Sequence, residues 1–164
     1  MQNMPAHEIV LFPPDVFKTL LDHEVNKSRR YGDSLTLIDL FIETDPANLE
    51  AQQSAEIFTL NILKIHLRQT DIPCKRENEF IILMPSTSAP GARSACERIR
   101  KLVNTEYQTD NGVPFKLFMF IGMAAMPIDH SLSSDELSKN ASQALLHART
   151  NRITNVIAFS EIPK

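Results

Sequence analysis

The sequence has few of the residues that mark disulfide-rich, zinc-binding or phosphate-loop proteins. Its 164 residues include two cysteines, four glycines and no tryptophan. Cys74 and Cys96 lie in apolar surroundings without CxxC or Cys/His spacing, so they predict neither a disulfide framework nor a zinc site. The chain contains no Gly-rich phosphate loop and no Gly-x-Ser-x-Gly elbow.

The sequence also lacks long apolar runs and an excess of basic residues. No run approaches the roughly 18 apolar residues of a membrane-spanning helix, and no basic stretch followed by an apolar segment opens the chain. We therefore expect a cytoplasmic protein, or the cytoplasmic part of a larger one, without membrane insertion. Seventeen Lys and Arg against twenty Asp and Glu give a formal net charge of -3, which disfavours nucleic acid as a partner.

The length and the apolar content are sufficient for one sizeable core. Hydrophobic residues make up 43% of the chain, and chains of this size are usually a single domain. Residues 1–13 lack clear periodicity and are predicted to be an N-terminal extension. Residues 14–164 contain no internal repeat, low-complexity stretch or flexible linker, so we expect them to form one domain.

Apolar spacing predicts helices and strands in a defined order. A helix begins near Pro14 and ends at Gly32. A strand over 35–42, apolar on both faces, belongs in the centre of a sheet, and a helix pair or one long helix fits 47–68. The elements that follow are a β-hairpin turning at 76–79, a helix over 92–103, a buried strand over 117–126, a helix over 137–148 and a closing strand over 155–159.

After the first helix, the order β-α-α-β-β-α-β-α-β predicts an α/β (α+β) domain with a central five-stranded mixed sheet and helices on both faces. Six segments in sequence order then carry a resemblance to a known family: Arg30-Tyr31-Gly32, Arg68-Gln69-Thr70-Asp71, 79–85, 97–100, 121–124 and 144–149. Over roughly residues 14–160 the chain resembles the palm-like GGDEF domain of bacterial diguanylate cyclases, which join two GTP molecules into cyclic di-GMP.

The resemblance implies a nucleotide site with two requirements. Carboxylates hold Mg²⁺ on the phosphates, and glycines let the backbone approach the nucleotide. The family's signature hairpin corresponds to Arg76, Glu77, Asn78, Glu79 and Phe80. Both glycine positions and the metal-site acid position have therefore changed, and only the final Glu-Phe is retained. Long side chains fill the space that a nucleotide needs, so we predict a degenerate domain without catalysis and without a cofactor.

The first strand departs from the family pattern as well. The resemblance puts the metal aspartate at Phe41, whose ring cannot ligate Mg²⁺. Asp39 and Glu43 share the strand face of Phe41, so one interpretation joins them with Glu79 in a residual acidic site. In the other, Asp39 is hydrogen-bonded near a strand end or to solvent, and Glu43 lies past the strand. Mg²⁺ is expected only if the first interpretation supports an enzyme.

A second family site is better retained. Arg68 and Asp71 match the inhibitory site where Arg and Asp bind cyclic di-GMP, and Arg98 falls where a further arginine often contributes. The planar guanidinium suits phosphate and the guanine edge, while a carboxylate accepts from guanine nitrogens. Alternatively, this Arg-x-x-Asp is a local ion pair or helix cap worth about 0.3–1 kcal/mol.

Selective loss of the nucleotide site favours a catalytically inactive signalling domain. It would act either as a cyclic di-GMP receptor at Arg68 and Asp71 or by contacting a protein partner. One alternative is a divergent active diguanylate cyclase or GTP-binding enzyme. The other is an architectural dimerisation domain, acting as a homodimer, and the sequence does not choose between that and the partner-binding interpretation.

Overall fold

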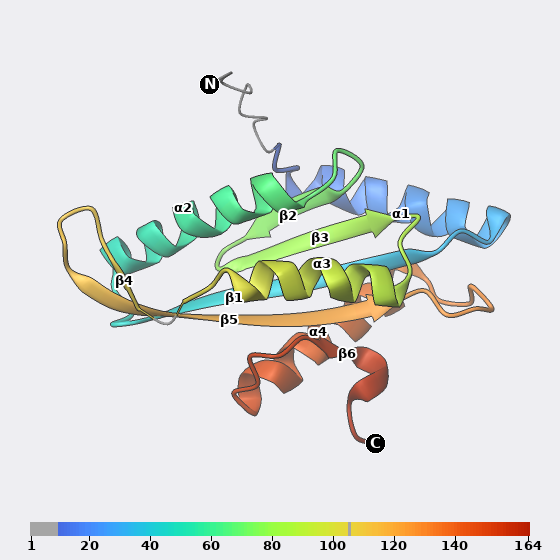
Figure 1. Ribbon diagram of the computed structural model, residues 1–164. Helices are drawn as coiled ribbons and strands as arrows, with labels where there is room; N and C mark the ends of the chain where they lie inside the picture. The colour runs from blue at the N-terminus through green and yellow to red at the C-terminus, as the bar shows by residue number, and fades with distance from the viewer. Residues whose placement is uncertain (1–9, 105) are drawn as a thin grey trace.

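The computed structural model describes residues 10–104 and 106–164, in which helices flank a twisted sheet (Figure 1). The elements along the chain are α1 (Pro14–Tyr31), β1 (Leu35–Asp45), α2 (Leu49–His66), β2 (Ile72–Arg76), β3 (Glu79–Pro85), α3 (Ala89–Lys101), β4 (Glu106–Gln108), β5 (Pro114–Ala125), α4 (Ser134–Thr150), β6 (Ile157–Ala158) and the short 3-10 helix η1 (Phe159–Glu161). This order confirms the predicted α/β fold. Residues 1–9 of the predicted N-terminal extension lie outside the described residues.

Local sequence signals explain where the helices begin and end. Pro14 occupies the first turn of α1, and Gly32 ends it with φ 73 while its N–H donates to the Ser28 carbonyl. Asn48 caps α2 by accepting from the Ala51 N–H at 2.9 Å. These caps fix the point at which α1 ends and the point at which α2 begins.

The sheet order is β2-β3-β1-β5-β4, with β6 also paired to β5. All pairs are antiparallel except β5 with β6, which is parallel, so the sheet is mixed as predicted. The sheet has six strands rather than the predicted five. The additional strand, β4, has three residues and is too short to show a period in the sequence.

The segment over 47–68, predicted as a helix pair or one long helix, is one long helix, α2. The predicted end of the first strand is corrected by the structure. β1 extends to Asp45 instead of ending near residue 42, because it pairs with β5 as far as Lys116. Asp39 is therefore buried in the middle of a strand and Glu43 lies inside it, whereas one interpretation placed Asp39 near a strand end and Glu43 past the strand.

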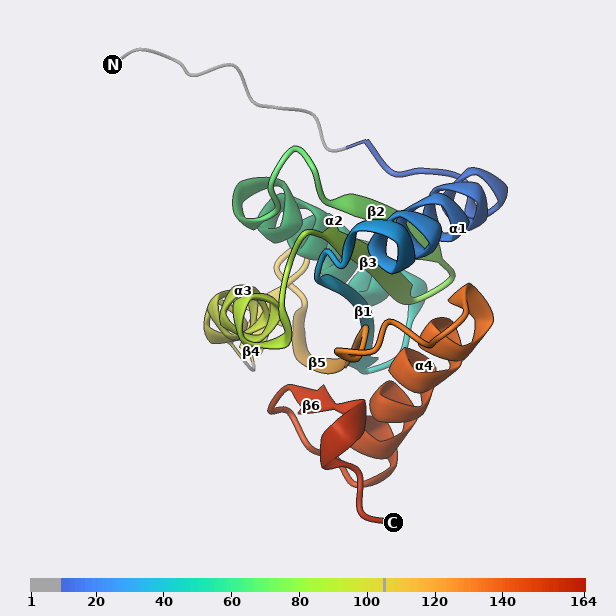
Figure 2. The ribbon, with the colours of Figure 1, turned by 90° about the vertical axis from the view of Figure 1, so that its right-hand side faces the viewer.

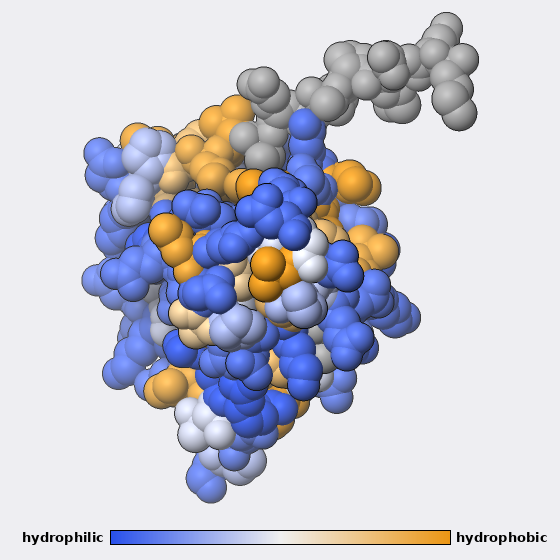
Figure 3. Space-filling view, turned by 90° about the vertical axis from the view of Figure 1, so that its left-hand side faces the viewer, coloured by the Kyte–Doolittle hydropathy of each residue, from blue (hydrophilic) through white to orange (hydrophobic). Residues whose placement is uncertain are grey.

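The two faces of the sheet carry different layers (Figure 2). Helices α2 and α3 cover one face, and α1 and α4 lie on the other. Alternation along β1 divides its side chains accordingly: Leu40 packs toward α2 and α3, and Leu37 toward α1. Seen from the side on which α2 begins, the surface is mostly hydrophilic with apolar groups between the polar ones (Figure 3).

Gly122 sets the distance between β5 and α4. A Cβ at this position would lie 2.2 Å from the Leu145 backbone nitrogen and 2.8 Å from the Ala144 carbonyl carbon. Only glycine permits this approach without a shift of the backbone. The residue directly opposite Gly122 on β1 is Asp39. The close contact therefore brings α4 over the part of β1 that contains the acidic residues.

Both edges of the sheet are partly covered. At one edge, Phe12 forms a bridge with Cys74 of β2, and its N–H donates to the Pro73 carbonyl at 2.9 Å. At the other, β4 pairs with the beginning of β5 and β6 with its later part. Within the described residues, no helix is long and apolar enough to cross a membrane.

Candidate functional site

The signature hairpin joins β2 to β3 through a two-residue turn, Glu77 and Asn78, with Arg76 paired opposite Glu79. Glu77 has φ 51, in the left-handed region that glycine adopts most readily. The Asn78 carbonyl accepts from the Ile42 N–H at 3.2 Å, which fixes the turn against β1. The backbone therefore favours glycine at a position where this chain has glutamate.

A cavity of about 730 Å³ lies beside this hairpin. The side chains that line it include Arg76, Glu77 and Glu79 from the hairpin, Phe41 from β1, and Ser142 and Arg149 from α4. The start of α1 also contributes Pro14. The cavity is thus formed by elements that are distant in sequence and meet across one face of the sheet. Its lining contains both acids and guanidinium groups, and an aromatic ring.

Asp39 lies on the same face of β1, two residues before Phe41, and is 2% exposed. Its Oδ2 accepts from the Ser142 hydroxyl at 3.4 Å, and its Oδ1 is buried with no hydrogen-bond partner among the described residues. Burial, and then the neighbouring Glu79 carboxylate, raise the pKa of Asp39 to about 7. The structure therefore brings Asp39 and Glu79 together, and Asp39 is only partly ionised near neutral pH.

Phe41 is covered by Arg149. The guanidinium carbon lies 3.7 Å from the centroid of the Phe41 ring, a close cation–π contact. In the sheet, Phe41 is flanked by Glu79 on β3 and Phe120 on β5. The position that the resemblance assigns to the metal aspartate therefore contains an aromatic ring with a cation stacked on it.

Glu43 does not join the other two acids. Its carboxylate forms an ion pair with Arg152 at 2.6 Å, and the Arg152 guanidinium carbon also lies 4.8 Å from the Phe120 ring centroid. Glu43 lies four positions after Asp39, a distance of roughly 13 Å along β1. The predicted three-residue acidic site is therefore not formed; only Asp39 and Glu79 meet.

These residues do not fit the Mg²⁺ site that the family resemblance implies. A magnesium ion needs oxygen ligands around one point, and the described residues contain no group of three or more His, Cys, Asp or Glu that could hold a metal ion. One of the two carboxyls that do meet is buried and has a raised pKa. The neighbouring guanidinium of Arg149 adds a positive charge.

Arg68 and Asp71 lie on the connection between α2 and β2. The Asp71 carboxylate accepts from the Arg68 backbone N–H at 2.8 Å and from its guanidinium at 3.2 Å. The guanidinium also donates to the Thr87 hydroxyl. The Asp71 side chain is 3% exposed and that of Arg68 is 55% exposed. The two predicted residues are thus in direct contact, with the acid buried and the base at the surface.

Arg98 lies on α3 with an exposed side chain. No hydrogen bond or ion pair among the described residues joins it to Arg68 or Asp71. The structure therefore brings together two of the three residues predicted for this site.

A family model described as diguanylate cyclase, GGDEF domain, matches residues 57–154. The chain belongs to the GGDEF family. The matched residues include the hairpin, the Arg68–Asp71 pair and Arg149. No curated protein matches the sequence.

Solved GGDEF domains have the same fold. The GGDEF domain of DgcB from Caulobacter crescentus, in complex with c-di-GMP, gives a TM-score of 0.80 at 15% identity, covering 98% of this chain and 97% of that chain. The GGDEF domain of PA1120 (TpbB or YfiN) from Pseudomonas aeruginosa gives 0.77 at 16% identity, covering 90% of each. The diguanylate cyclase SiaD, in complex with its activator SiaC from Pseudomonas aeruginosa, gives 0.79 at 20% identity, covering 90% and 58%.

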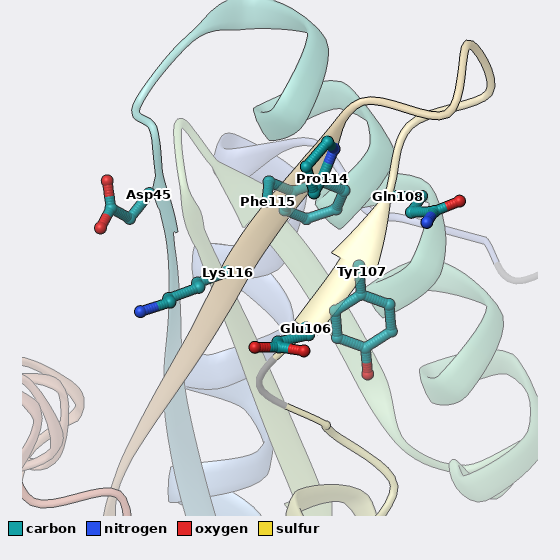
Figure 4. Close-up of a pocket in the computed structure, with 7 residues that line it drawn as sticks. All are labelled: Asp45, Glu106, Tyr107, Gln108, Pro114, Phe115 and Lys116. Atoms are coloured by element: carbon teal, nitrogen blue, oxygen red, sulfur yellow. The ribbon is translucent and has the colours of Figure 1, made fainter.

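The GGDEF domain has another cavity, of about 610 Å³, near the β4–β5 pair (Figure 4). Lys116 lies between Asp45 and Glu106, which are its partners on the two neighbouring strands. Tyr107 stacks on Phe115, with 5.8 Å between the ring centroids. Opposite charges thus alternate across three strands here, and neither of the two lining acids is buried.

Sequence reasoning missed three side chains that engage the predicted residues: Ser142, Thr87 and Arg152. Each comes from a different part of the chain from its partner, so no local spacing signals the contact. The run that contains Arg149 matched a family segment and was therefore detectable, but its contact with Phe41 was not.

Proposed function

We propose that this GGDEF domain is a regulatory domain that does not synthesise cyclic di-GMP. The observation that carries the proposal is Phe41 beneath the Arg149 guanidinium, 3.7 Å from ring centroid to guanidinium carbon. A phenyl ring offers no lone pair to Mg²⁺, and the guanidinium repels a cation at the same place. The position that would have to bind the metal instead binds a side chain of the protein itself.

The remaining acids support the same proposal. Glu79 is retained, but its neighbour Asp39 is buried and has a pKa of about 7. A protonated carboxyl is a poor metal ligand because it has lost its charge. At the turn, the Glu77 side chain stands where the family has a glycine, and its negative charge disfavours a phosphate. Nucleotide approach and metal binding are thus both weakened.

Catalysis is tested directly by incubating the purified chain with GTP and Mg²⁺ or Mn²⁺ and separating the products by chromatography. We expect GTP to be recovered unchanged. The matched control is Glu79→Ala, which removes the one acid of the signature that is retained. Turnover by the wild type that Glu79→Ala abolishes would contradict the proposal and favour a divergent cyclase.

Arg68 favours a second candidate, a cyclic di-GMP receptor. Its guanidinium is bound to Asp71 and Thr87, yet the side chain is 55% exposed and accessible to a phosphate. Asp71, at 3% exposed, would hold Arg68 in position rather than contact a ligand. DgcB, which shares the fold, was solved with c-di-GMP.

Calorimetric titration with cyclic di-GMP separates the receptor from an interaction domain. We expect binding heat from the wild type and its loss in Arg68→Ala. Arg100→Ala is the matched control, because Arg100 is paired with Glu97 on α3 rather than with Asp71. An absence of heat from the wild type at micromolar concentration removes the receptor and leaves a protein partner, the kind of ligand that SiaC is for SiaD.

The proposal treats residues 14–164 as one degenerate, cytoplasmic GGDEF domain with residues 1–13 as its extension. The bridge from Phe12 to Cys74 ties the end of this extension to the sheet. A truncation that begins at residue 14 should therefore fold with somewhat lower stability, which thermal denaturation would measure.

A further inference from the structure

Both hydrogens on Nη2 of Arg68 are used by the protein itself. One is donated to the Asp71 carboxylate at 3.2 Å and the other to the Thr87 hydroxyl. Within residues 10–104 and 106–164, the hydrogen bonds of this side chain involve neither Nε nor Nη1. Because the side chain is 55% exposed, these two nitrogens are the ones that remain for a ligand.

The free nitrogens of Arg68 do not form a pair. A guanidinium binds a phosphate or a carboxylate best through two parallel N–H groups on one edge. It has two such edges, one formed by Nε with Nη2 and the other by Nη1 with Nη2. Both edges include Nη2, and the N–H groups of Nε and Nη1 do not lie parallel on a common edge. As the structure stands, Arg68 therefore offers a ligand only single N–H groups.

The Thr87 hydroxyl is an acceptor held at a fixed point. Its own hydrogen is donated to the Pro85 carbonyl at 2.9 Å, so Arg68 donates to a lone pair of Oγ1. Thr87 is 8% exposed, and its carbonyl accepts from the buried Thr36 hydroxyl at 2.9 Å. The connection between β3 and α3 thus presents Arg68 with one well-positioned neutral acceptor.

Of the two contacts at Nη2, the one with Thr87 is the easier to break. The Asp71 carboxylate also accepts from the Arg68 backbone N–H at 2.8 Å, and a hydrogen bond between charged groups is stronger than one to a neutral hydroxyl. If Arg68 leaves, Thr87 keeps its hydrogen bond to Pro85. A cavity of about 500 Å³, lined by Arg68 and Lys64 among others, provides room for a ligand beside the guanidinium.

We propose that the Thr87 hydroxyl competes with ligands for Arg68, and that a ligand with two adjacent acceptor atoms displaces it. The inference rests on the second candidate function above, a cyclic di-GMP receptor at Arg68. Cyclic di-GMP presents paired acceptors in two places, on its phosphates and on O6 and N7 of its guanines. When it binds, Nη2 leaves Thr87 and a complete edge of the guanidinium turns to the ligand. Thr87 thereby lowers the affinity of the site.

Calorimetric titration of the full chain with cyclic di-GMP tests the competition. Thr87→Val keeps the shape of the side chain and removes the acceptor, so we expect it to bind about tenfold more tightly than the wild type. Thr87→Ser keeps the hydroxyl and should bind like the wild type. A merely structural role for Thr87 predicts the opposite sign, because a loosened site binds more weakly.

Thr19→Val is the matched control. The Thr19 hydroxyl also donates to a backbone carbonyl, that of Asp15, but no arginine of the described residues donates to it. Its replacement should leave the affinity unchanged. Cyclic di-AMP serves as a second ligand, because it has the same phosphates with adenine in place of guanine. A similar gain with both ligands assigns the released Nη2 to a phosphate, and a gain with cyclic di-GMP alone assigns it to the guanine edge.

A second measurement needs no ligand. NMR of the arginine side-chain N–H groups reports rotation about the Cζ–Nη2 bond, which we expect to be slow for Arg68 in the wild type and in Thr87→Ser and faster in Thr87→Val. Equal rotation in the wild type and Thr87→Val overturns the competition, because Thr87 then does not hold Nη2.

The outcomes separate this inference from the receptor on which it rests. Wild-type binding that Thr87→Val leaves unchanged or weakens overturns the competition, while the receptor stands. Binding by Thr87→Val alone supports the competition and shows that the hydroxyl closes the site to the ligand. An absence of heat from the wild type and from every Thr87 variant removes the receptor, and the competition with it.

Discussion

Arg68 and Arg149 are engaged in opposite ways. Arg68 binds a buried carboxylate, that of Asp71, and donates to the Thr87 hydroxyl on the connection between β3 and α3. Arg149 lies on the ring of Phe41, and the nearest buried acid on that strand, Asp39, has one oxygen without a partner. The first region retains matched polar groups. In the second, an aromatic ring carries the cation, and the neighbouring acid has become costly to ionise. The difference shows that this fold holds an arginine either by a paired carboxylate or by an aromatic ring, and that only the first arrangement leaves the polar groups matched.

The largest expected loss of stability comes from a substitution that pushes α4 away from the sheet. Gly122→Ala places a Cβ 2.2 Å from the Leu145 backbone nitrogen, so we expect a loss of at least about 3 kcal/mol of unfolding free energy. Urea denaturation measures it. Gly91→Ala is the control, because its Cβ meets only side-chain atoms at 3.5 Å. Equal stability of the two variants would show that α4 can move away from the sheet at little cost.

The contact between Asp39 and Glu79 predicts that the stability of the folded protein depends on pH. Asp39 has a pKa of about 7 in the folded protein, against 3.8 for an aspartate in its ordinary, exposed state. Between these values the folded state holds a proton that the unfolded state has lost, so stability falls as the pH rises through about 7. Asp39→Asn should remove this dependence. The difference in unfolding free energy between variant and wild type should shift in favour of the variant by on the order of 2–3 kcal/mol from about pH 5 to pH 8.

Chemical denaturation at a series of pH values measures this difference. Glu79→Gln is an informative companion, because it removes the charge that helps to raise the pKa of Asp39 and should move the transition to lower pH. Parallel pH profiles for Asp39→Asn and the wild type would mean that Asp39 is ionised throughout.

Removing the Asp71 carboxylate that binds Arg68 should lower the free energy of unfolding. Asp71→Ala removes the acceptor for both the Arg68 backbone N–H and its guanidinium, and we expect a loss of about 2 kcal/mol. Asp135→Ala is the matched control, because Asp135 pairs with Lys18 at an 89% exposed position and should change stability little. A similar small effect at both positions would place Asp71 among ordinary surface acids. Thermal denaturation provides the measurement.

Removing the Arg149 guanidinium that stacks on Phe41 should have the smallest effect on stability. Arg149→Ala removes the cation–π contact with Phe41, and we expect a loss of about 0.5–1 kcal/mol. Arg149→Lys keeps the charge but not the planar stacking and should recover part of it. A gain in stability on removal of Arg149 would mean that its charge is repelled at this position by Arg76 or Arg152. Urea denaturation distinguishes these results.

Residue patterns predicted most of the fold because long apolar runs have a clear period. The run that contains Leu37 and Leu40 indicated a central strand, and β1 does lie between β3 and β5. β4 was not predictable because three residues define no period. The burial of Asp39 was not predictable either, since an acid within an apolar run gives no sign of whether a helix covers it.

In the candidate site, too, a contact between residues close in sequence was predictable and a long-range contact was not. Arg68 and Asp71 are three residues apart, and their contact follows from a local turn. The pairing of Glu43 with Arg152 joins residues 109 positions apart. Such a contact depends on how α4 crosses the sheet, which is set by Gly122 and not by any spacing near either residue.

The edges of the sheet bear on how readily other molecules could add a strand to it. Exposed strand edges invite further strands from other molecules. Here β2 carries Pro73, which cannot donate, and is bridged by Phe12, while β4 and β6 divide the opposite edge of β5 between them. The strands at these edges are short, at five, three and two residues. They therefore offer only a short length of backbone with which a strand of another molecule could pair.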